Sequence, residues 1–293
     1  MMPTYHIGSL SDEAKKALAD NEANAGDDSD GPRPTFLRSK AWSKAILFGK
    51  RIVSWDTRIF TFQLENPDQK LGLPVGQHLM VRLKDRKTQD NIIRSYTPIS
   101  EINDQGFMDM LVKVYFDRDG VKGGKMSQAM DALAIGDPIE MKGPIGKFEY
   151  LGHGRCTIQG VERKVSKFIM ICGGSGITPI FQVFRAIMQN PEDQTPCVVL
   201  NGNRQFEDIL CKPELDALAE GNDHRCKLIY TLTKASDDWT GLRGRVDGKL
   251  INCHCDDDAQ ALVLICGPTP LEESMRKVFL ETKGWDQDRL LFF

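Results

Sequence analysis

The part of the chain from Trp42 to about Leu151 consists of short runs in which apolar and polar residues alternate, separated by Gly, Pro, Asn and Asp. Such alternation is typical of strands with one buried face, and only Met126–Leu133 has helical spacing. Six strands at this spacing predict an antiparallel barrel. The predicted strands are Ala45–Ser54, Ile59–Leu64, His78–Leu83, Ile92–Pro98, Phe107–Tyr115 and Pro138–Lys142.

From Lys167 onward, longer apolar runs alternate with helical segments, which is typical of a parallel sheet covered by helices. The boundary between the two regions is expected near Gly152–Ser166, so residues 42–151 and 152–293 are predicted to be separate domains. The predicted strands are Phe168–Cys172, Cys197–Asn201, Lys227–Leu232 and Leu262–Cys266, and the predicted helices are Pro179–Met188, Pro213–Ala219 and Pro270–Thr282.

The first 41 residues have a different character. Ser11–Ala19 predicts a short helix, whereas Asp20–Pro34 is acidic and contains no apolar residue larger than Ala, which indicates a flexible linker. A short folded piece followed by a linker suggests that the chain is part of a longer protein.

The composition excludes several classes of protein. The 293 residues carry 38 Lys and Arg against 41 Asp and Glu, a net charge of −3, which gives no general affinity for nucleic acid. The chain has neither an apolar run long enough to cross a bilayer nor a signal-peptide core, so we expect no membrane span and a cytoplasmic location with reduced thiols. Cys253-His254-Cys255 has tight spacing but no second ligand pair, so we predict a loop and no metal.

Four strings carry candidate chemistry. Arg94-Ser95-Tyr96-Thr97-Pro98-Ile99-Ser100 offers a guanidinium for pyrophosphate, a ring for a heterocycle and hydroxyls, although alone it could simply end a strand. Gly123-Gly124-Lys125-Met126-Ser127 precedes a helix and is either an anion site or an ordinary turn. Cys172 to Pro179 (CGGSGITP) joins an apolar strand to a helix, and Cys266-Gly267-Pro268 ends the last long strand, where α/β folds place ligands.

In this order, the strings resemble the ferredoxin–NADP reductase superfamily, and in particular its cytochrome b5 reductase and nitrate reductase branch. In that branch, RxYTxxS and GGKMS hold FAD, GGxGITP takes the pyridine nucleotide, and CGP lies beside the nicotinamide. The resemblance covers Trp42 to Phe293. It implies a six-stranded antiparallel Greek-key FAD barrel followed by a Rossmann-like parallel-sheet nucleotide domain.

The resemblance also implies roles for single residues. Arg94 and Ser127 would contact the FAD pyrophosphate, and Lys113 would give positive charge near the flavin. Thr97 would bond near flavin N5, while Cys266 would orient the nicotinamide without acting as a nucleophile; Thr97, Lys113 and Cys266 are the candidate catalytic residues. Thr178 would reach the flavin from the second domain. The other candidate cofactor contacts are Ser95, Tyr96, Val112, Val114, Tyr115, Gly124, Lys125 and Met126 for FAD, and Gly173, Gly174, Gly176, Gly267 and Pro268 for the nucleotide.

One departure bears on the nucleotide. Many NADH-using relatives carry an acidic residue after the strand that corresponds to Lys227–Leu232, where this chain has Thr233-Lys234. A hydroxyl and a cation would accept a 2′-phosphate, and Arg204 is a second candidate for that phosphate. We therefore predict a preference for NADPH over NADH; the alternative is that Lys234 and Arg204 are solvated surface charges. A second departure, CGPTPL in place of CGPPPM, leaves the chemistry unchanged.

The opening, Met1 to Leu10, resembles the end of a cytochrome b5 domain, without the haem motif, so His6 is expected to be a solvated tail residue. The resemblance thus implies the flavin reductase fragment of a fungal-type assimilatory nitrate reductase, with haem b and molybdenum cofactor elsewhere in the full-length enzyme. The expected partner is a b5-type haem domain that docks near Lys122 and Lys125, and a homodimer is expected only through domains outside this chain. The alternatives are a stand-alone NADH-cytochrome b5 reductase and a flavin-binding module without turnover.

Overall fold

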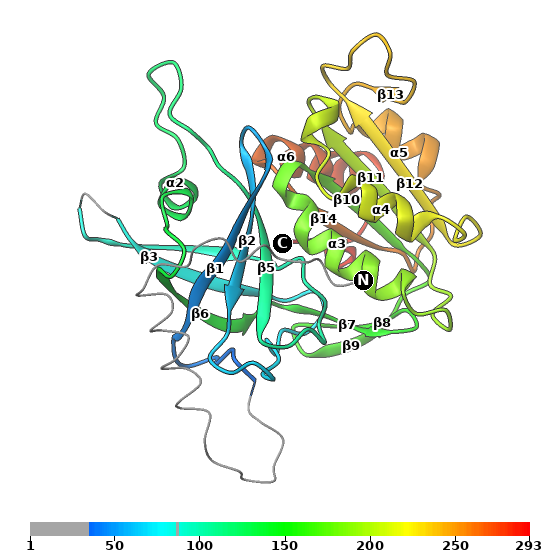
Figure 1. Cartoon of the computed structure of the whole chain (residues 1–293). Coiled ribbons are helices and arrows are strands. Elements are labelled where there is room, and N and C mark those ends of the chain that lie inside the picture. Colours follow the sequence, from blue (N-terminus) through cyan, green and yellow to red (C-terminus); the bar gives the residue numbers. More distant parts are fainter. Residues whose placement is uncertain (1–34, 86–87) are drawn as a thin grey trace. The chain divides into compact units, whose positions relative to one another are not determined.

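The computed structural model describes residues 35–85 and 88–293, which divide into two units. Within these ranges, the first unit comprises residues 35–73 and 78–145, and the second comprises 74–77 and 146–293 (Figure 1). The predicted helix Ser11–Ala19, the linker Asp20–Pro34 and the b5-like opening with His6 lie outside the described residues. The limits given above for the domains stay predictions.

The first unit contains a six-stranded antiparallel sheet in the order β4-β3-β6-β1-β2-β5. The segment after β4 returns to β5, where the Ile99 amide donates to the Asp109 carbonyl (2.8 Å). All six predicted strands and the single helix are confirmed, with small shifts at their ends. They are β1 (Ser43–Ser54), β2 (Thr57–Gln63), β3 (His78–Lys84), β4 (Asn91–Tyr96), β5 (Phe107–Lys113), β6 (Pro138–Ile145) and α2 (Lys125–Asp131).

The buried side chains of this unit form one apolar core, in which Phe60, Phe62, Leu47, Leu79 and Met110 are fully buried. Burial of this apolar surface supplies most of the driving force for folding of the unit. The core also supports Tyr96, which packs against it from the end of β4.

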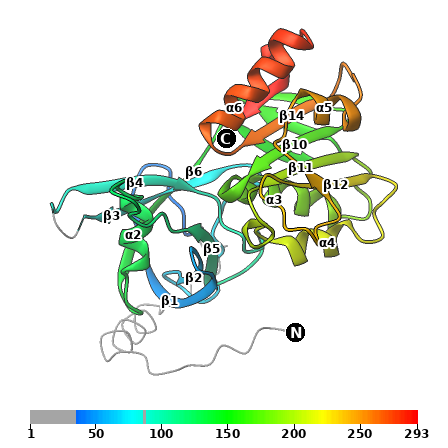
Figure 2. The same cartoon turned by 90° about the horizontal axis from the view of Figure 1, so that it is seen from above.

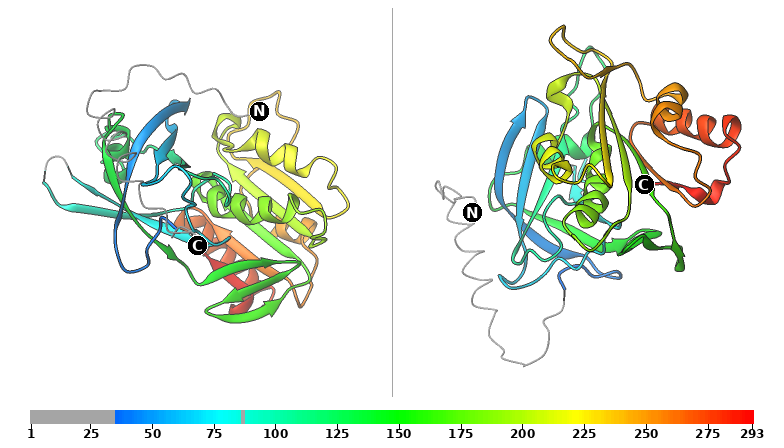
Figure 3. Two further views of the ribbon diagram at one scale, coloured as in Figure 1. Left: turned by 60° about the horizontal axis from the view of Figure 1, so that its bottom comes forward. Right: turned by 90° about the vertical axis from the view of Figure 1, so that its right-hand side faces the viewer.

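The second unit is built on a six-stranded parallel sheet in the order β13-β12-β11-β10-β14-β15. Figure 2 shows α3 and α4 on one face of the sheet and α5 and α6 on the other, and the alternation of strand and helix can be followed by colour in Figure 3. Both faces are covered, so β10 (Phe168–Gly173) and β14 (Leu262–Cys266) read as continuous apolar runs. The remaining elements are β11 (Cys197–Asn203), β12 (Cys226–Leu232), β13 (Leu242–Arg243), β15 (Leu290–Phe292), α3 (Ile177–Met188), α4 (Lys212–Ala219), α5 (Gly248–His254) and α6 (Thr269–Arg276).

The predicted strands and helices of the second unit are confirmed, but several elements were not predicted. The segment Gly152–Ser166, expected to be a boundary, belongs largely to a three-stranded antiparallel sheet of β7 (Phe148–Gly152), β8 (Arg155–Ile158) and β9 (Val161–Lys164). Two tight turns connect these strands, with positive φ at His153 and Gln159 and at the glycine after each. The predicted helix Pro270–Thr282 is present in two parts. The first part belongs to α6, which ends at Arg276, and a π-helix follows over Lys277–Thr282. The missed strands and α-helix are β7, β8, β9, β13, β15 and α5.

The loop predicted for Cys253-His254-Cys255 is wrong, because Cys253 and His254 form the last turn of α5 and Cys255 caps it. Asp247 begins this helix by accepting a hydrogen bond from the Leu250 amide (2.9 Å). None of the helices in the described ranges combines the length and the apolar character that a bilayer crossing requires.

A buried polar network joins β7 to the segment before β11. The Asp193 carboxylate accepts hydrogen bonds from the Tyr150 hydroxyl, the His153 amide and both the amide and hydroxyl of Thr195. Arg225 donates to the carbonyls of Asp193, Asn190 and Met188, which lie in and before the same segment. Burial alone would raise the pKa of Asp193, but the bonds from Thr195, Tyr150 and His153 outweigh it and lower the pKa.

Candidate functional site

The glycine turn after β10 lies against the end of β14. A Cβ atom added to Gly176 would meet the Cys266 carbonyl oxygen at 2.2 Å and the Gly267 nitrogen at 2.8 Å. Gly173 is also enclosed, with Pro268 and Leu271 about 3.4 and 3.3 Å from its hypothetical Cβ. Gly174 has φ of +56°, which favours glycine. The structure therefore brings the CGGSG turn and the Cys266-Gly267-Pro268 string together, as the sequence predicts for a ligand-binding sheet edge.

Two buried asparagines hold this turn and were not predicted. The Gly174 amide donates to Asn203 Oδ1 (3.2 Å), and Asn203 Nδ2 donates to Asn201 Oδ1 (2.8 Å). Both side chains lie at the end of β11, with 1% and 7% exposure for Asn201 and Asn203. Two amides spaced by two residues at the end of an otherwise apolar strand were the available sequence signal, because they share one face of the sheet.

Cys266 lies half-buried beside Cys172, its register partner on β10. Burial, followed by the charge of Glu272, raises the pKa of the Cys266 thiol to about 12. The thiol is therefore protonated at neutral pH, which suits a packing and orienting group and argues against a nucleophile. Thr178, at the start of α3, is buried and its hydroxyl donates to the Ser175 carbonyl (3.3 Å).

The three candidates for a 2′-phosphate site lie side by side at the carboxyl ends of β11 and β12. The Thr233 amide donates to the Asn203 carbonyl (3.0 Å), and the Lys234 amide donates to the Arg204 carbonyl (2.7 Å). The side chains of Arg204, Thr233 and Lys234 are all exposed. Arg245, also exposed, follows β13, whose neighbour on the sheet is β12. It was not predicted, because a short edge strand gives little sequence signal.

In the first unit, Arg94, Ser95 and Tyr96 end β4 and Thr97 follows it. Arg94 is exposed and its guanidinium donates to the Ile93 carbonyl (2.7 Å). Ser95 is exposed and bonds Met80 Sδ (3.3 Å), whereas Thr97 is buried. Burial raises the pKa of Tyr96 well above its usual range, and the nearby charge of Arg94 opposes this shift. The end of β4 thus presents a cation, a hydroxyl and a neutral ring in sequence.

Lys113 forms an ion pair that the sequence did not predict. Its ammonium lies 2.9 Å from Asp56 Oδ2, and the Asp56 side chain is only 6% exposed. The pairing of Thr57 with Lys113 in the β2–β5 register brings Asp56 to this position. Val112 and Val114 on either side are buried, and Tyr115 is 51% exposed. The charge predicted near a flavin is therefore held in place by a buried carboxylate.

The GGKMS string folds against Tyr115. The Gly124 amide donates to the Tyr115 carbonyl (2.8 Å), while Ser127 Oγ accepts from the Tyr115 amide (3.1 Å) and donates to the Gly124 carbonyl (3.1 Å). Met126 packs into the barrel core, and Lys125 is exposed. The structure thus joins the end of β5 to the start of α2, and Ser127 has a structural part in that join besides its predicted phosphate contact.

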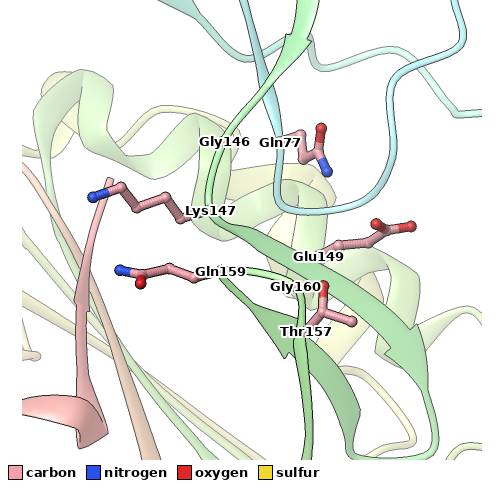
Figure 4. A pocket seen from close by; sticks show the side chains of 7 residues that line it. All are labelled: Gln77, Gly146, Lys147, Glu149, Thr157, Gln159 and Gly160. Carbon is pink, nitrogen blue, oxygen red and sulfur yellow. The ribbon is translucent and has the colours of Figure 1, made fainter.

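A separate open pocket of about 480 Å³ lies in the second unit (Figure 4). Its walls carry Lys147 and Gln159 on one side and Gln77 and Glu149 on the other, and none of the predicted site residues lines it. The candidate site therefore rests on the two strand edges described above.

Comparison with known proteins assigns both units. The Oxidoreductase FAD-binding domain family matches residues 44–150, and the Oxidoreductase NAD-binding domain family matches residues 170–277. The solved cytochrome b5 reductase domain of Ulva prolifera nitrate reductase is 34% identical with a TM-score of 0.83, over 89% of this chain and all of that one. The predicted fold class and the FAD and pyridine-nucleotide classes of cofactor are confirmed.

Two relatives define the chain further. The Nitrate reductase [NADPH] of Aspergillus niger is 55% identical over the whole chain, and this chain spans about a third of the length of such nitrate reductases (33% for the A. niger protein). The rat NADH-cytochrome b5 reductase 3 is 41% identical over 84% of this chain and 85% of its own length. The chain therefore belongs to the cytochrome b5 reductase family of FAD- and NAD(P)-binding oxidoreductases, and it corresponds to the flavin reductase region of the fungal NADPH nitrate reductases.

Proposed function

We propose that this chain transfers a hydride from NADPH to FAD and passes electrons singly to a b5-type haem domain, as the reductase part of a nitrate reductase. FAD and the nicotinamide supply the redox chemistry, and the protein supplies binding, orientation and charge. Reduction of nitrate, haem b and the molybdenum cofactor would belong to other parts of the full-length enzyme, since the chain spans a third of its relatives.

The donor set of the first unit suits FAD. Arg94 is an exposed cation at the end of β4, which can bind a pyrophosphate in a bidentate manner, and Lys125 and Ser127 begin the nearby helix α2. Tyr96 and Tyr115 supply aromatic rings that can lie against a flavin. Thr97 would bond the flavin, and Lys113 would hold positive charge beside it, in a position fixed by Asp56. These assignments, with Ser95, Val112, Val114, Gly124 and Met126 as further FAD contacts, are part of the proposal.

The second unit would take the dinucleotide at the carboxyl edge of its sheet. Gly174, with no atom within 4 Å of its Cβ position, would let a pyrophosphate approach the backbone before α3, while Gly173 and Gly176 let this turn pack closely against the end of β14. Cys266, Gly267 and Pro268 would lie beside the nicotinamide, where the protonated thiol packs and orients the ring. Thr178 is proposed to contribute to flavin contact.

The proposal of NADPH is carried by one observation: the backbone bonds between Thr233–Lys234 and Asn203–Arg204 place two cations and a hydroxyl at one sheet edge. A carboxylate there would favour the 2′-hydroxyl of NADH, whereas cations favour a phosphate. We expect kcat/KM for NADPH to exceed that for NADH at least tenfold, about 1.4 kcal/mol, measured as ferricyanide reduction by the FAD-loaded protein. Lys234→Asp should reverse the preference mainly through KM.

The matched control is Lys164→Asp, which changes an exposed lysine on β9. It should leave the ratio of NADPH to NADH unchanged. A wild-type preference for NADH would instead favour the second candidate, a stand-alone NADH-cytochrome b5 reductase, which is supported by the match over 85% of the rat enzyme. No turnover with either nucleotide would contradict both and leave a flavin-binding module.

The haem partner is proposed to dock on the first unit near Lys122 and Lys125, which are both exposed. Because b5-type domains are acidic, Lys122→Glu should lower kcat/KM for cytochrome b5 severalfold at low ionic strength, and added salt should remove the difference. Bleaching of the flavin by NADPH in the absence of oxygen should not change. A Lys122→Glu variant that reduces cytochrome b5 as fast as wild type would place the partner elsewhere.

A further inference from the structure

Phe206 is an exposed aromatic side chain at the sheet edge that carries the proposed 2′-phosphate site. It begins a short 3-10 turn, Phe206–Asp208, two residues after Arg204, and its side chain is half-exposed (50%). The Arg204 carbonyl holds the Lys234 amide, so Phe206 follows directly on the residues that bring Arg204, Thr233 and Lys234 together. A single exposed apolar residue needs no explanation, but this one lies beside a cluster of cations.

The ring of Phe206 is fixed by its neighbours. The Trp239 ring lies 5.9 Å away between centroids, tilted by 58°, and Lys212 Nζ lies 5.9 Å from the Phe206 centroid. Lys212 is held in turn by Asp216 (2.5 Å), and the Gln205 amide donates to Asp208 (3.2 Å) across the turn. A ring that is constrained on part of its surface and exposed on the rest offers a preformed flat face with little entropy to lose on binding.

Trp239 is held in place by hydrogen bonds within its own loop. Its indole Nε1 donates to the Leu242 carbonyl (3.0 Å), and Arg243 donates to the carbonyls of Ala235, Ser236 and Trp239. Gly241 lies under the indole, where a Cβ atom would meet the ring at 2.4 Å. The Arg243 guanidinium therefore stabilises the loop that carries Trp239, and it supports Phe206 indirectly through the Trp239 ring.

We propose that Phe206 stacks on the adenine of NADPH and is an affinity-determining residue for the adenosine half of the nucleotide. This inference rests on the proposed NADPH site. In NADPH the adenine and the 2′-phosphate are attached to neighbouring carbons of one ribose, so a phosphate held by Arg204, Thr233 and Lys234 keeps the adenine close to this edge. Purines present a flat π-face, and an aromatic side chain is the residue type that stacks on it.

The test measures binding of adenosine 2′,5′-bisphosphate to the FAD-loaded protein by calorimetry, together with the KM for NADPH. Phe206→Ala should raise the Kd of the bisphosphate and the KM for NADPH about tenfold. Turnover of reduced nicotinamide mononucleotide, which lacks the adenosine, should not change. Phe206→Trp should restore binding, whereas Phe206→Leu, which is apolar but has no π-face, should remain weak.

The matched control is Phe107→Ala, which removes another exposed aromatic ring, 37% exposed, from the first unit and should leave the bisphosphate affinity unchanged. A Kd within twofold of wild type in Phe206→Ala, or full affinity in Phe206→Leu, would overturn the stacking proposal. Failure of the NADPH proposal is distinguishable, because wild-type protein would then bind 5′-AMP, which lacks only the 2′-phosphate, as tightly as the bisphosphate. The same variants measured with 5′-AMP would still report whether Phe206 stacks on adenine.

Discussion

Replacing Asp193 with asparagine is expected to lower the free energy of unfolding of the protein by about 3 kcal/mol at pH 7. The Asp193 side chain is buried and accepts four hydrogen bonds, from Tyr150, His153 and Thr195. An asparagine has an NH2 group in place of one carboxylate oxygen, so its N–H donors would face other N–H and O–H donors. Either the Tyr150 hydroxyl or the Thr195 hydroxyl would then lose its acceptor. The measurement is urea denaturation followed by circular dichroism.

The loss should depend on pH in a direction that the pKa of Asp193 determines. Because that pKa is lowered in the folded protein, the carboxylate stabilises the fold above its unfolded value of about 4, and the contribution disappears as the pH falls through the folded pKa. Wild type and Asp193→Asn should therefore differ most near pH 7 and converge as the pH falls below about 4. Glu192→Gln, a neighbouring exposed acid, is the control and should follow wild type throughout. A gap that stays constant between pH 7 and pH 3 would contradict the assignment.

The strands could be predicted from the sequence where apolar and polar side chains alternate. In the first unit, apolar and polar residues alternate in β1, β3 and β6, and Gly or Pro marks the turns, so all six strands were found. The sheet β7–β9 was missed because its strands are only four or five residues long and are separated by the two-residue turns His153-Gly154 and Gln159-Gly160. Its stability comes from tertiary contacts, among them the bond from Tyr150 to Asp193, which lie 43 residues apart.

The sequence motifs of the candidate site could be predicted, but the contacts that hold them in place could not. The glycine turn, Cys266 and Thr233-Lys234 follow strands whose carboxyl ends must share one edge of a parallel sheet, so the sequence could place them together. Asn203 and Asp56 were missed because each acts on a partner distant in sequence: Asn203 holds Gly174, 29 residues earlier, and Asp56 holds Lys113 across the β2–β5 pair. Short-range pattern carries no information on such pairs, whereas sheet register determines them.

The glycine turn should tolerate no side chain at Gly176. In Gly176→Ala, the added Cβ would lie 2.2 Å from the Cys266 carbonyl oxygen and 2.5 Å from its carbon, so the backbone of the turn or of the CGP string must move. Displacement of about 1 Å in residues that orient a nucleotide costs on the order of 100-fold in rate. We therefore expect kcat/KM for NADPH to fall about 100-fold, while FAD content and the yellow colour stay unchanged, because all the proposed FAD contacts except Thr178 belong to the first unit.

Gly248→Ala separates this effect from a general cost of replacing glycine. Its Cβ would meet Val278 at 3.4 Å, an ordinary contact, at the first residue of α5. That variant should retain wild-type kcat/KM and melting temperature. If Gly176→Ala also turned over NADPH at the wild-type rate, the close approach of the turn to Cys266 would not be needed for catalysis. If it lost FAD along with activity, the damage would not be confined to the nucleotide site, and the role given to the turn would be wrong.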